Sequence, residues 1–155
     1  MSVYYAYYDS PIGAVEITAA DDHIKSLYFR DELGETDLNT PPVMQECINQ
    51  LDEYFKKERT DFDLPLSAEG TEFQHRVWKA LLNVPFGRTA SYLDIANILG
   101  DRNSVRAVGN ANGKNPISVI VPCHRIIGSG GKLIGYGGGL WRKEWLLKHE
   151  GSLLI

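Results

Sequence analysis

Three short stretches near the N-terminus are rich in aromatic and β-branched side chains, and the second alternates them regularly with polar residues. They cover residues 3–8, 14–19 and 24–29, and turn-forming residues separate them at Asp9-Ser10-Pro11-Ile12-Gly13 and Asp21-Asp22-His23. This pattern predicts strands, and connections this short favour an antiparallel meander. We expect His23, in its turn, to be exposed to solvent.

The next stretch changes to a helical period. After Pro41-Pro42, apolar residues recur at steps of three and four, at Met44, Ile48, Leu51 and Phe55. Proline is favoured in the first turn of a helix, so a helix is predicted to begin there. Cys47 lies inside this helix beside the apolar stripe, which indicates a buried and inert thiol.

Two capping signals follow in the second half. Thr71-Glu72-Phe73-Gln74 has the form of a capping box, and Ser91-Tyr92-Leu93-Asp94 offers a second cap before a short apolar helix that ends at Gly100. Residues 104–112 predict a further short helix. Two short helices joined by a Gly-containing turn fit a helix-turn-helix, although packed helices without any DNA role share this pattern.

These elements predict an α+β protein of two small domains. Residues 1–70 would form an N-terminal antiparallel sheet with a helix, and residues 71–155 a mainly helical C-terminal domain with a helix-turn-helix, similar to a winged helix. Residues 64–70, which show no clear periodicity, would form the boundary.

The second helix of the predicted pair carries unusual side chains. Apart from Val105 and Val108 they are small or polar, with Arg106 as the one cation. Small residues let a helix come close to a nucleic-acid backbone, which suits a shallow minor-groove contact. The same composition also permits tight packing between helices, and the sequence alone does not separate the two interpretations.

The net charge is divided unevenly along the chain. Residues 1–70 contain 5 Lys and Arg against 15 Asp and Glu, a net charge of −10, whereas residues 71–155 contain 11 against 5, a net charge of +6. An acidic half joined to a basic half suggests that the second half meets a polyanion, unless the division only reflects solvated surface charge.

Composition excludes several classes of protein. The 155 residues are 43% hydrophobic and 23% charged, which rules out disorder, collagen and a disulfide-stapled miniprotein. No apolar run approaches the ~20 residues of a membrane span, and the chain begins with neither a basic stretch nor a signal-peptide core. We therefore expect a cytoplasmic protein that enters no membrane, in which Cys47 and Cys123 stay reduced.

The strongest candidate for chemistry is Pro122-Cys123-His124-Arg125, which follows a β-branched run over residues 117–121. A cysteine is a good nucleophile only as thiolate, which needs a nearby base or positive potential, and the flanking His124 and Arg125 are of both types. We expect an extended segment, in which adjacent side chains point to opposite faces, so His124 would need a turn or a water molecule to reach the sulfur. Glu150, after a helix predicted over residues 141–149, is a candidate to orient the histidine.

Seven glycines fall among residues 128–139, around Lys132 and Tyr136. Such a segment can pass close to a ligand because it has few side chains. It lacks the Lys-Ser or Lys-Thr of a nucleotide-binding loop, and no cluster of His, Cys, Asp or Glu in the sequence has the spacing of a zinc site.

The second half closely resembles the O6-alkylguanine-DNA alkyltransferase family, while the first half is similar to its variable N-terminal domain only in outline. The motifs that carry the resemblance are Ser10-Pro11-Ile12-Gly13, Arg106-Ala107-Val108-Gly109, Asn115-Pro116, Ile120-Val121-Pro122-Cys123-His124-Arg125-Ile126-Ile127, Gly135-Tyr136, Gly138-Gly139-Leu140 and Lys143-Glu144-Trp145-Leu146-Leu147. Pro-Cys-His-Arg in this context is highly specific to the family.

The resemblance implies a suicide DNA repair protein. It would transfer an alkyl group such as methyl from O6 of a damaged guanine irreversibly to Cys123, once per molecule, after flipping the nucleotide out of the duplex. The implied partner is double-stranded DNA containing O6-alkylguanine, bound by a monomer through the minor groove with little dependence on sequence. The resemblance implies no metal and no organic cofactor.

The resemblance also implies roles for residues at the matching motif positions. Cys123 would be the acceptor, His124 the base acting through water, and Glu150 the residue that orients His124. Asn115 would brace the turn that presents Cys123.

Five residues would contact the DNA or the flipped base: Ser91, Tyr92, Arg106, Arg125 and Tyr136. Tyr92 would assist rotation of the base, Arg106 would fill the vacated place in the stack, and Tyr136 would lie near the guanine O6. Gly137 stands where some relatives carry a serine, so the tolerance of bulky alkyl groups stays open.

When the residues are considered without the resemblance, three other classes of function are consistent with the sequence. A cysteine hydrolase would need a distant histidine, and none of His23, His75 and His149 has a supporting motif. A redox-sensing helix-turn-helix regulator would read a defined operator. A non-catalytic binder of alkylated DNA resembles the family throughout but carries tryptophan at the acceptor position, where this chain has Cys123.

Overall fold

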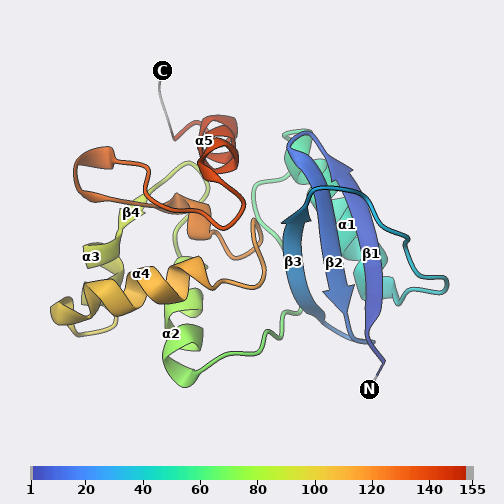
Figure 1. Cartoon of the computed structure of the whole chain (residues 1–155), viewed down its shortest axis with the longest axis horizontal. Coiled ribbons are helices and arrows are strands. Elements are labelled where there is room, and N and C mark those ends of the chain that lie inside the picture. The colour runs from blue at the N-terminus through green and yellow to red at the C-terminus, as the bar shows by residue number, and fades with distance from the viewer. Residues whose placement is uncertain (1, 153–155) are drawn as a thin grey trace. The chain divides into compact units, whose positions relative to one another are not determined.

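The computed structural model describes residues 2–152, within a chain that divides into two compact units, Met1–Glu69 and Gly70–Ile155 (Figure 1). The first unit contains a three-stranded antiparallel sheet and one helix. Its strands are β1 (Tyr4–Ser10), β2 (Gly13–Ala19) and β3 (Ile24–Arg30), in the order β1-β2-β3, and its helix is α1 (Pro42–Phe55). The meander and helix predicted for the first half are thereby confirmed.

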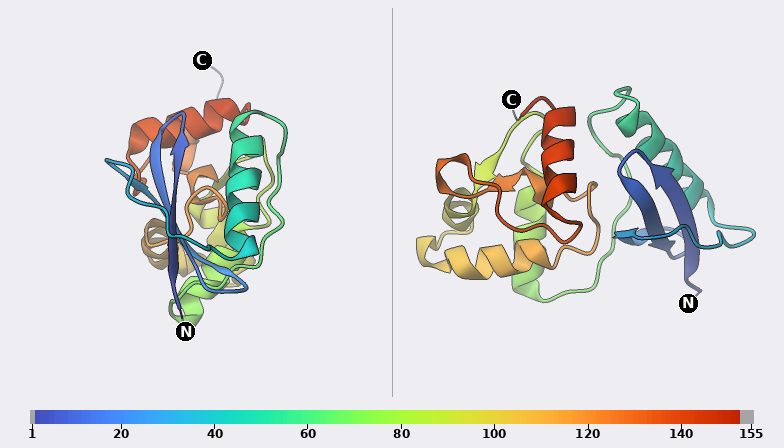
Figure 2. Two further views of the ribbon diagram at one scale, coloured as in Figure 1. Left: turned by 90° about the vertical axis from the view of Figure 1, so that its right-hand side faces the viewer. Right: turned by 45° about the horizontal axis from the view of Figure 1, so that its top comes forward.

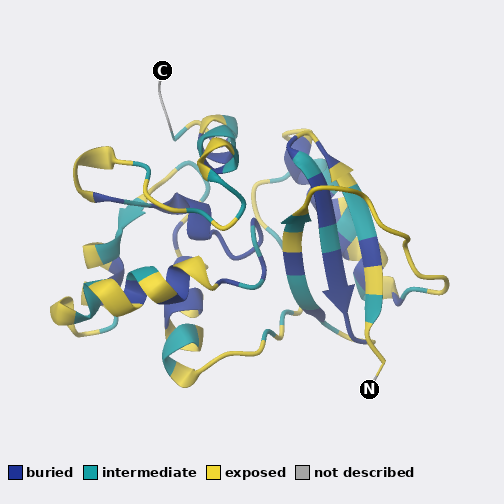
Figure 3. Cartoon of the chain, in the orientation of Figure 1, coloured by how far each residue is buried: buried dark blue, intermediate teal, exposed yellow. Residues whose placement is uncertain are grey.

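One face of this sheet is covered by α1, which contacts all three strands (Figure 2). The core between them is made of fully buried apolar side chains, among them Ala6, Val15, Ile17, Leu27, Met44 and Leu51. The central strand β2 is the most completely buried of the three (Figure 3). Cys47 is buried in this core, as predicted. His23 differs from the prediction, because it is half-buried and its Nδ1 lies 2.7 Å from a carboxylate oxygen of Asp22.

The second unit is mainly helical. Its helices are α2 (Glu72–Leu81), α3 (Tyr92–Ile98), α4 (Val105–Gly113) and α5 (Leu140–His149). Two short strands, β4 (Ala90–Ser91) and β5 (Ile126–Ile127), and three 3-10 turns, η1 (Arg102–Ser104), η2 (Cys123–Arg125) and η3 (Ser129–Gly131), complete it. Within residues 2–152, no helix has the length and apolar character needed to cross a membrane.

Both predicted capping boxes form. The Thr71 hydroxyl accepts a hydrogen bond from the backbone N–H of Gln74, and Ser91 does the same for Asp94, while each partner's side chain accepts from the backbone N–H of the cap residue. These bonds satisfy amide groups that a helix start leaves free, so they fix where α2 and α3 begin. Helices α3 and α4 pack against each other after a turn at Gly100, the arrangement predicted for a helix-turn-helix.

A parallel pairing between β4 and β5 joins two distant parts of the second unit. Ala90 pairs with Ile126 and Ser91 with Ile127. Because β4 leads directly into α3 and β5 directly follows η2, this pairing brings the first turn of α3 beside the segment that contains Cys123.

Residues 117–125 depart from the extended segment predicted for them. The chain turns between residues 117 and 121, and residues 123–125 form η2. Two physical reasons account for the difference. Pro116 and Pro122 offer no N–H to a neighbouring strand, and the side chain of Asn115 takes up the backbone groups that a strand would have used.

Candidate active site

Asn115 holds the turn that leads to Cys123. Its Nδ2 donates to the carbonyl oxygens of Val121 at 2.8 Å and Ile117 at 3.3 Å, and its Oδ1 accepts from the backbone N–H of Ile117 at 3.0 Å. All these groups are buried, so each bond removes the cost of leaving a polar group unpaired. The Asn115 side chain therefore sets the path of the chain immediately before Cys123.

The same turn contains a backbone conformation that is rare for its residue type. Val119 has φ of 71° and is buried. A β-branched residue at positive φ is strained by about 1–3 kcal/mol and persists only where its surroundings hold it. The bonds made by Asn115 on both sides of Val119 are the restraint visible in the structure.

Helix α4 also reaches the backbone of Cys123. Asn112, in the last turn of this helix, is buried, and its Nδ2 donates to the carbonyl oxygen of Cys123 at 3.4 Å. The end of α4 is thus joined directly to the residue that carries the thiol. Nothing in the sequence pattern indicated this link.

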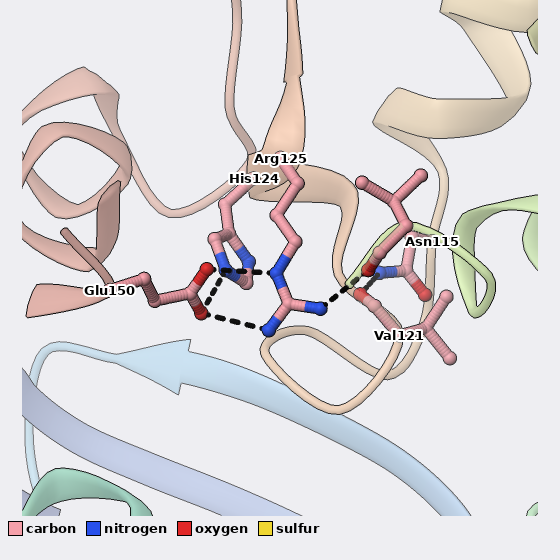
Figure 4. A network of polar contacts seen from close by, with 6 residues as sticks. Asn115, Val121, His124, Arg125 and Glu150 are labelled. Carbon is pink, nitrogen blue, oxygen red and sulfur yellow. Dashed lines mark hydrogen bonds and ion pairs between the residues drawn. The ribbon is translucent and has the colours of Figure 1, made fainter. Parts of the chain in front are cut away.

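Glu150 lies at the centre of a buried polar network (Figure 4). Its carboxylate accepts a hydrogen bond from His124 Nε2 at 2.8 Å. It also accepts two from Arg125, one from Nε at 2.8 Å and one from Nη2 at 3.0 Å. Arg125 Nη1 donates to the carbonyl oxygen of Val84 at 2.7 Å. A two-pronged guanidinium contact of this kind is strong and directional, so it fixes the carboxylate that in turn orients the imidazole.

This network sets the charges of its members. Burial alone would raise the pKa of Glu150, but hydrogen bonds from His124 and Arg125 outweigh it and lower that pKa to about 2. Burial lowers the pKa of His124, and the Glu150 carboxylate only partly offsets the effect. At neutral pH Glu150 is therefore ionised and His124 is neutral.

The tautomer of His124 follows from its partner. An ionised carboxylate can only accept a hydrogen bond, so the proton of neutral His124 is on Nε2 and the lone pair is on Nδ1. Nδ1 is buried and has no hydrogen-bond partner among the described residues. His124 thus holds a free basic nitrogen next in the chain to Cys123.

The thiol of Cys123 rests in its protonated form. Burial raises its pKa, while contributions from Asn115, the charge of Lys143 and nearby backbone amides act in the opposite direction. A buried thiol that must become a thiolate needs a base to take its proton and positive potential to stabilise the anion. Lys143 supplies positive potential at this cysteine, and the basic nitrogen of His124 belongs to the residue that follows it in the chain.

Lys143 is a site residue that the sequence reasoning missed. Its side chain is fully buried, and its Nζ donates to the carbonyl oxygens of Ile126 at 2.5 Å, Ile134 at 3.1 Å and Gly135 at 3.4 Å. One signal could have found it. On α5 it lies three and four residues before the buried Leu146 and Leu147, so the helical period puts a lysine on the apolar face.

Two tyrosines lie beside the same glycine-rich segment. Tyr92, the first residue of α3, donates its hydroxyl to the carbonyl oxygen of Ile134 at 3.2 Å. Burial and the neighbouring Cys123 raise the pKa of both Tyr92 and Tyr136, so both hydroxyls stay protonated. Both tyrosines thus interact electrostatically with Cys123, while their predicted contacts with the flipped base stay a prediction.

The remaining predicted contacts fall in three different settings. Arg106 is exposed on α4 and makes no hydrogen bond or ion pair with the described residues. Ser91 uses its hydroxyl oxygen for the cap of α3. Arg125 corrects the prediction of a DNA contact, because its guanidinium is buried on Glu150 and Val84. A charge placed that deep holds the network together and is not available to DNA.

Comparison with known proteins covers nearly the whole chain. Residues 3–68 match the ribonuclease-like domain of 6-O-methylguanine DNA methyltransferase, and residues 72–152 match the DNA-binding domain of the same protein family. The two matches correspond to the α+β unit and the helical unit. The fold and the matched families together define a DNA-binding protein of the alkyl-transfer class.

Individual relatives agree with these matches. The chain is 45% identical over 154 residues to the methylated-DNA–protein-cysteine methyltransferase of Mycobacterium tuberculosis, covering 97% of this chain and 93% of that protein. It is 44% identical over 155 residues to the same protein of Methanosarcina acetivorans, covering 97% and 99%. The crystal structure of the M. tuberculosis O6-methylguanine methyltransferase has 46% identity and a TM-score of 0.87, covering 97% of this chain and 94% of that one. The M. tuberculosis protein has also been crystallised in complex with DNA, with a TM-score of 0.86.

The chain belongs to the O6-methylguanine DNA methyltransferase family, whose members repair O6-methylguanine in DNA by transferring its methyl group to a cysteine of the protein. The alternatives of a redox regulator and a hydrolase are set aside by this membership. The non-catalytic binder is set aside by the similarity to methyltransferases over nearly the whole chain.

Proposed function

We propose that Cys123 is the cysteine that accepts the alkyl group, irreversibly and once per molecule. One observation carries the proposal: His124, the residue that follows Cys123 in the chain, is neutral, is fixed through Nε2 by Glu150, and keeps a buried basic Nδ1 without a hydrogen-bond partner among the described residues. Cys47, the other cysteine, has no such neighbour, and burial alone raises its pKa to about 12.

The reaction proceeds in two linked steps. Nδ1 of His124 takes the proton of Cys123 through a water molecule, and Glu150 stabilises the imidazolium that results. The thiolate then attacks the alkyl carbon, so that an S–C bond forms while the bond between that carbon and guanine O6 breaks. The electron pair stays on the purine, which takes back one proton and leaves as ordinary guanine. The thioether is stable in water, so the protein is used once.

Other residues assist without touching the sulfur. Asn115 braces the turn that presents Cys123, and the protonated hydroxyl of Tyr136 stabilises the charge that develops on O6. Arg125 acts on Glu150, where its cation keeps the carboxylate ionised.

We further propose that residues 71–155 bind double-stranded DNA through α4, in the minor groove and with little sequence preference. The net charge of +6 of this part supplies attraction to phosphates. Apart from Arg106, the exposed surface of α4 carries small side chains such as Ala107 and Asn110, which let the helix come close to the DNA backbone. O6 is buried in a stacked base pair, so the nucleotide must be flipped out. Arg106 would fill the gap in the stack, while Tyr92 would assist rotation and Ser91 would contact the adjacent backbone.

Two further features complete the proposal. The protein acts as a monomer, because one copy contains every group that the reaction requires. It acts in the cytoplasm, where reducing conditions suit the two free cysteines of the structure, since Cys123 must remain a thiol.

Intact-mass spectrometry after mixing with a duplex that contains O6-methylguanine tests the central proposal. We expect one methyl group per protein molecule, located by peptide mapping on Cys123. Cys123→Ser should still bind DNA and gain no mass, and Cys47→Ser should react like the unmodified protein. Several turnovers per molecule, or a methyl group on Cys47, would overturn the single-use mechanism.

A further inference from the structure

Lys143 is a buried cation without an anionic partner in the resting site. No carboxylate oxygen among the described residues lies within 4 Å of its Nζ, because Glu150 is engaged by His124 and Arg125. Within residues 2–152, three backbone carbonyl oxygens are its only hydrogen-bond partners. Taking an ammonium out of water is costly unless an opposite charge offsets it, so such a group is uncommon in a protein core.

The group whose negative charge acts on Lys143 is the thiol of Cys123. Burial lowers the pKa of Lys143 to about 8, and a negative charge on Cys123 acts to raise it. In the other direction, the positive charge of Lys143 lowers the pKa of Cys123. Other titratable groups that interact with Cys123 or Lys143 are His124, which is neutral, and Tyr92 and Tyr136, which stay protonated.

The carbonyl contacts of Lys143 give it a second connection to the site. Ile126 begins β5, three residues after Cys123, whereas Ile134 and Gly135 belong to the glycine-rich segment 128–139. The carbonyl oxygen of Ile134 also accepts the hydroxyl of Tyr92. The ammonium therefore ties the glycine-rich segment to the strand that follows the cysteine, at the point where α3 contacts the same segment.

We propose that Lys143 is a positioning residue that supplies the countercharge of the Cys123 thiolate and holds the glycine-rich segment against the acceptor site. The inference rests on the proposed role of Cys123 as acceptor. Its consequence is that the thiolate formed when His124 takes the thiol proton at neutral pH is accompanied by an ammonium at position 143, and not by a neutral amine. Methyl transfer then leaves a neutral thioether, and the ammonium loses its countercharge.

The pH dependence of alkylation tests the countercharge. Free O6-benzylguanine reports on the sulfur without any DNA step, and intact-mass spectrometry gives the rate of benzyl transfer between pH 6 and 10. Lys143→Met, which keeps the length of the side chain and removes its charge, should move the midpoint of the profile upward by about one pH unit. The rate at pH 7.5 should fall about tenfold, because the thiolate fraction falls by that factor.

Two matched variants complete the experiment. Lys148→Met removes a lysine of the same helix that is half-exposed and paired with Glu144, and it should leave the profile unchanged. Lys143→Arg retains the charge and should keep the midpoint near that of the unmodified protein, even where its larger head slows the reaction. A midpoint in Lys143→Met equal to that of the unmodified protein would overturn the proposal, as would a midpoint in Lys143→Arg that moves as far as in Lys143→Met.

A reciprocal measurement needs no variant at position 143. The 13C resonance of the Lys143 side chain, followed by NMR against pH, should titrate at higher pH in the unmodified protein than in Cys123→Ser, because serine forms no anion in this range. Equal midpoints would refute the pairing. Benzyl transfer to a residue other than Cys123 would instead refute the proposed acceptor, so the two failures can be told apart.

Discussion

The two cysteines of this chain are both buried, but they differ in the groups that act on their thiols. Cys47, in α1, is surrounded by the apolar core of the first unit, and burial is the only influence on its thiol. Cys123, in η2, is equally withdrawn from solvent, yet Asn115, Lys143 and backbone amides all act to favour its thiolate. Burial is therefore common to the two cysteines, and the polar groups that act on Cys123 distinguish it from Cys47.

The difference reflects how the two cysteines are held. Cys47 occupies a regular helix whose backbone bonds are satisfied within the helix. Cys123 follows an irregular turn whose backbone bonds are completed by side chains, those of Asn115 and Asn112. Irregular backbone must recruit polar side chains, and these same side chains are the ones that can act on a nearby thiol.

The largest effect should come from acid, through Glu150. Its pKa of about 2 lies below the ordinary carboxyl value of 4.5, so the ionised form stabilises the fold above about pH 5. That contribution, about 3 kcal/mol from the size of the shift, should be lost as the pH falls from about 5 to about 2. Urea unfolding of the unmodified protein and of Glu150→Gln measures it, because the variant should lack this component of the acid loss. If the free energy of unfolding fell with pH in the same way in both proteins, the network would contribute nothing to folding.

A second effect, somewhat smaller, should appear in the rate at Cys123. Glu150→Gln replaces the carboxylate by a neutral amide, which stabilises the imidazolium of His124 less well. We expect methyl transfer to slow by about a hundredfold, within the range of general-base catalysis, and the apparent pKa of the thiol to rise. Stopped-flow rates against pH check both. An unchanged pH profile would mean that Cys123 is activated without His124.

Sequence patterns found the parts of this molecule that depend on local forces. The three strands, the caps at Thr71 and Ser91 and the helix before Glu150 all follow from neighbouring residues, and each appears in the structure near its predicted place. The motif that resembles the alkyltransferases pointed to Cys123. Glu150, predicted to orient His124, lies with its carboxylate 2.8 Å from His124 Nε2.

What the sequence could not supply depends on tertiary contacts. The resemblance implied that Arg125 contacts DNA, whereas folding turns this side chain inward, onto a carboxylate 25 residues away. The β-branched run before Cys123 predicted an extended chain, yet the side chain of Asn115 and the two prolines bend it and hold Val119 at positive φ. Lys143 acquires its environment only when α5 packs beside β5 and the glycine-rich segment.

A third prediction separates the chemistry at the sulfur from the extrusion of the base. Arg106 is exposed on α4 and makes no contact with the network around Cys123. Arg106→Ala should slow repair of O6-methylguanine in duplex DNA by an amount on the order of 2 kcal/mol, which is part of the cost of unstacking a base. It should affect transfer from free O6-benzylguanine much less, since no stack has to open. Paired rate constants on the two substrates decide the matter, and equal losses on both would remove Arg106 from the flipping step.

The smallest effect is expected at Cys47, and it should concern stability alone. Cys47→Ala removes one buried sulfur from the apolar face of α1 and should lower the free energy of unfolding by about 1 kcal/mol, because a small cavity is left and no hydrogen bond is lost. Cys47→Val keeps most of the volume and should cost less. Neither variant should change the rate of methyl transfer, since only burial acts on this thiol and no base or cation is paired with it. Thermal unfolding and single-turnover rates measured on the same samples test both halves of this expectation. A rate that falls in Cys47→Val while its stability is unchanged would show that the thiol in the first unit takes part in the reaction, and the contrast between the two cysteines would fail.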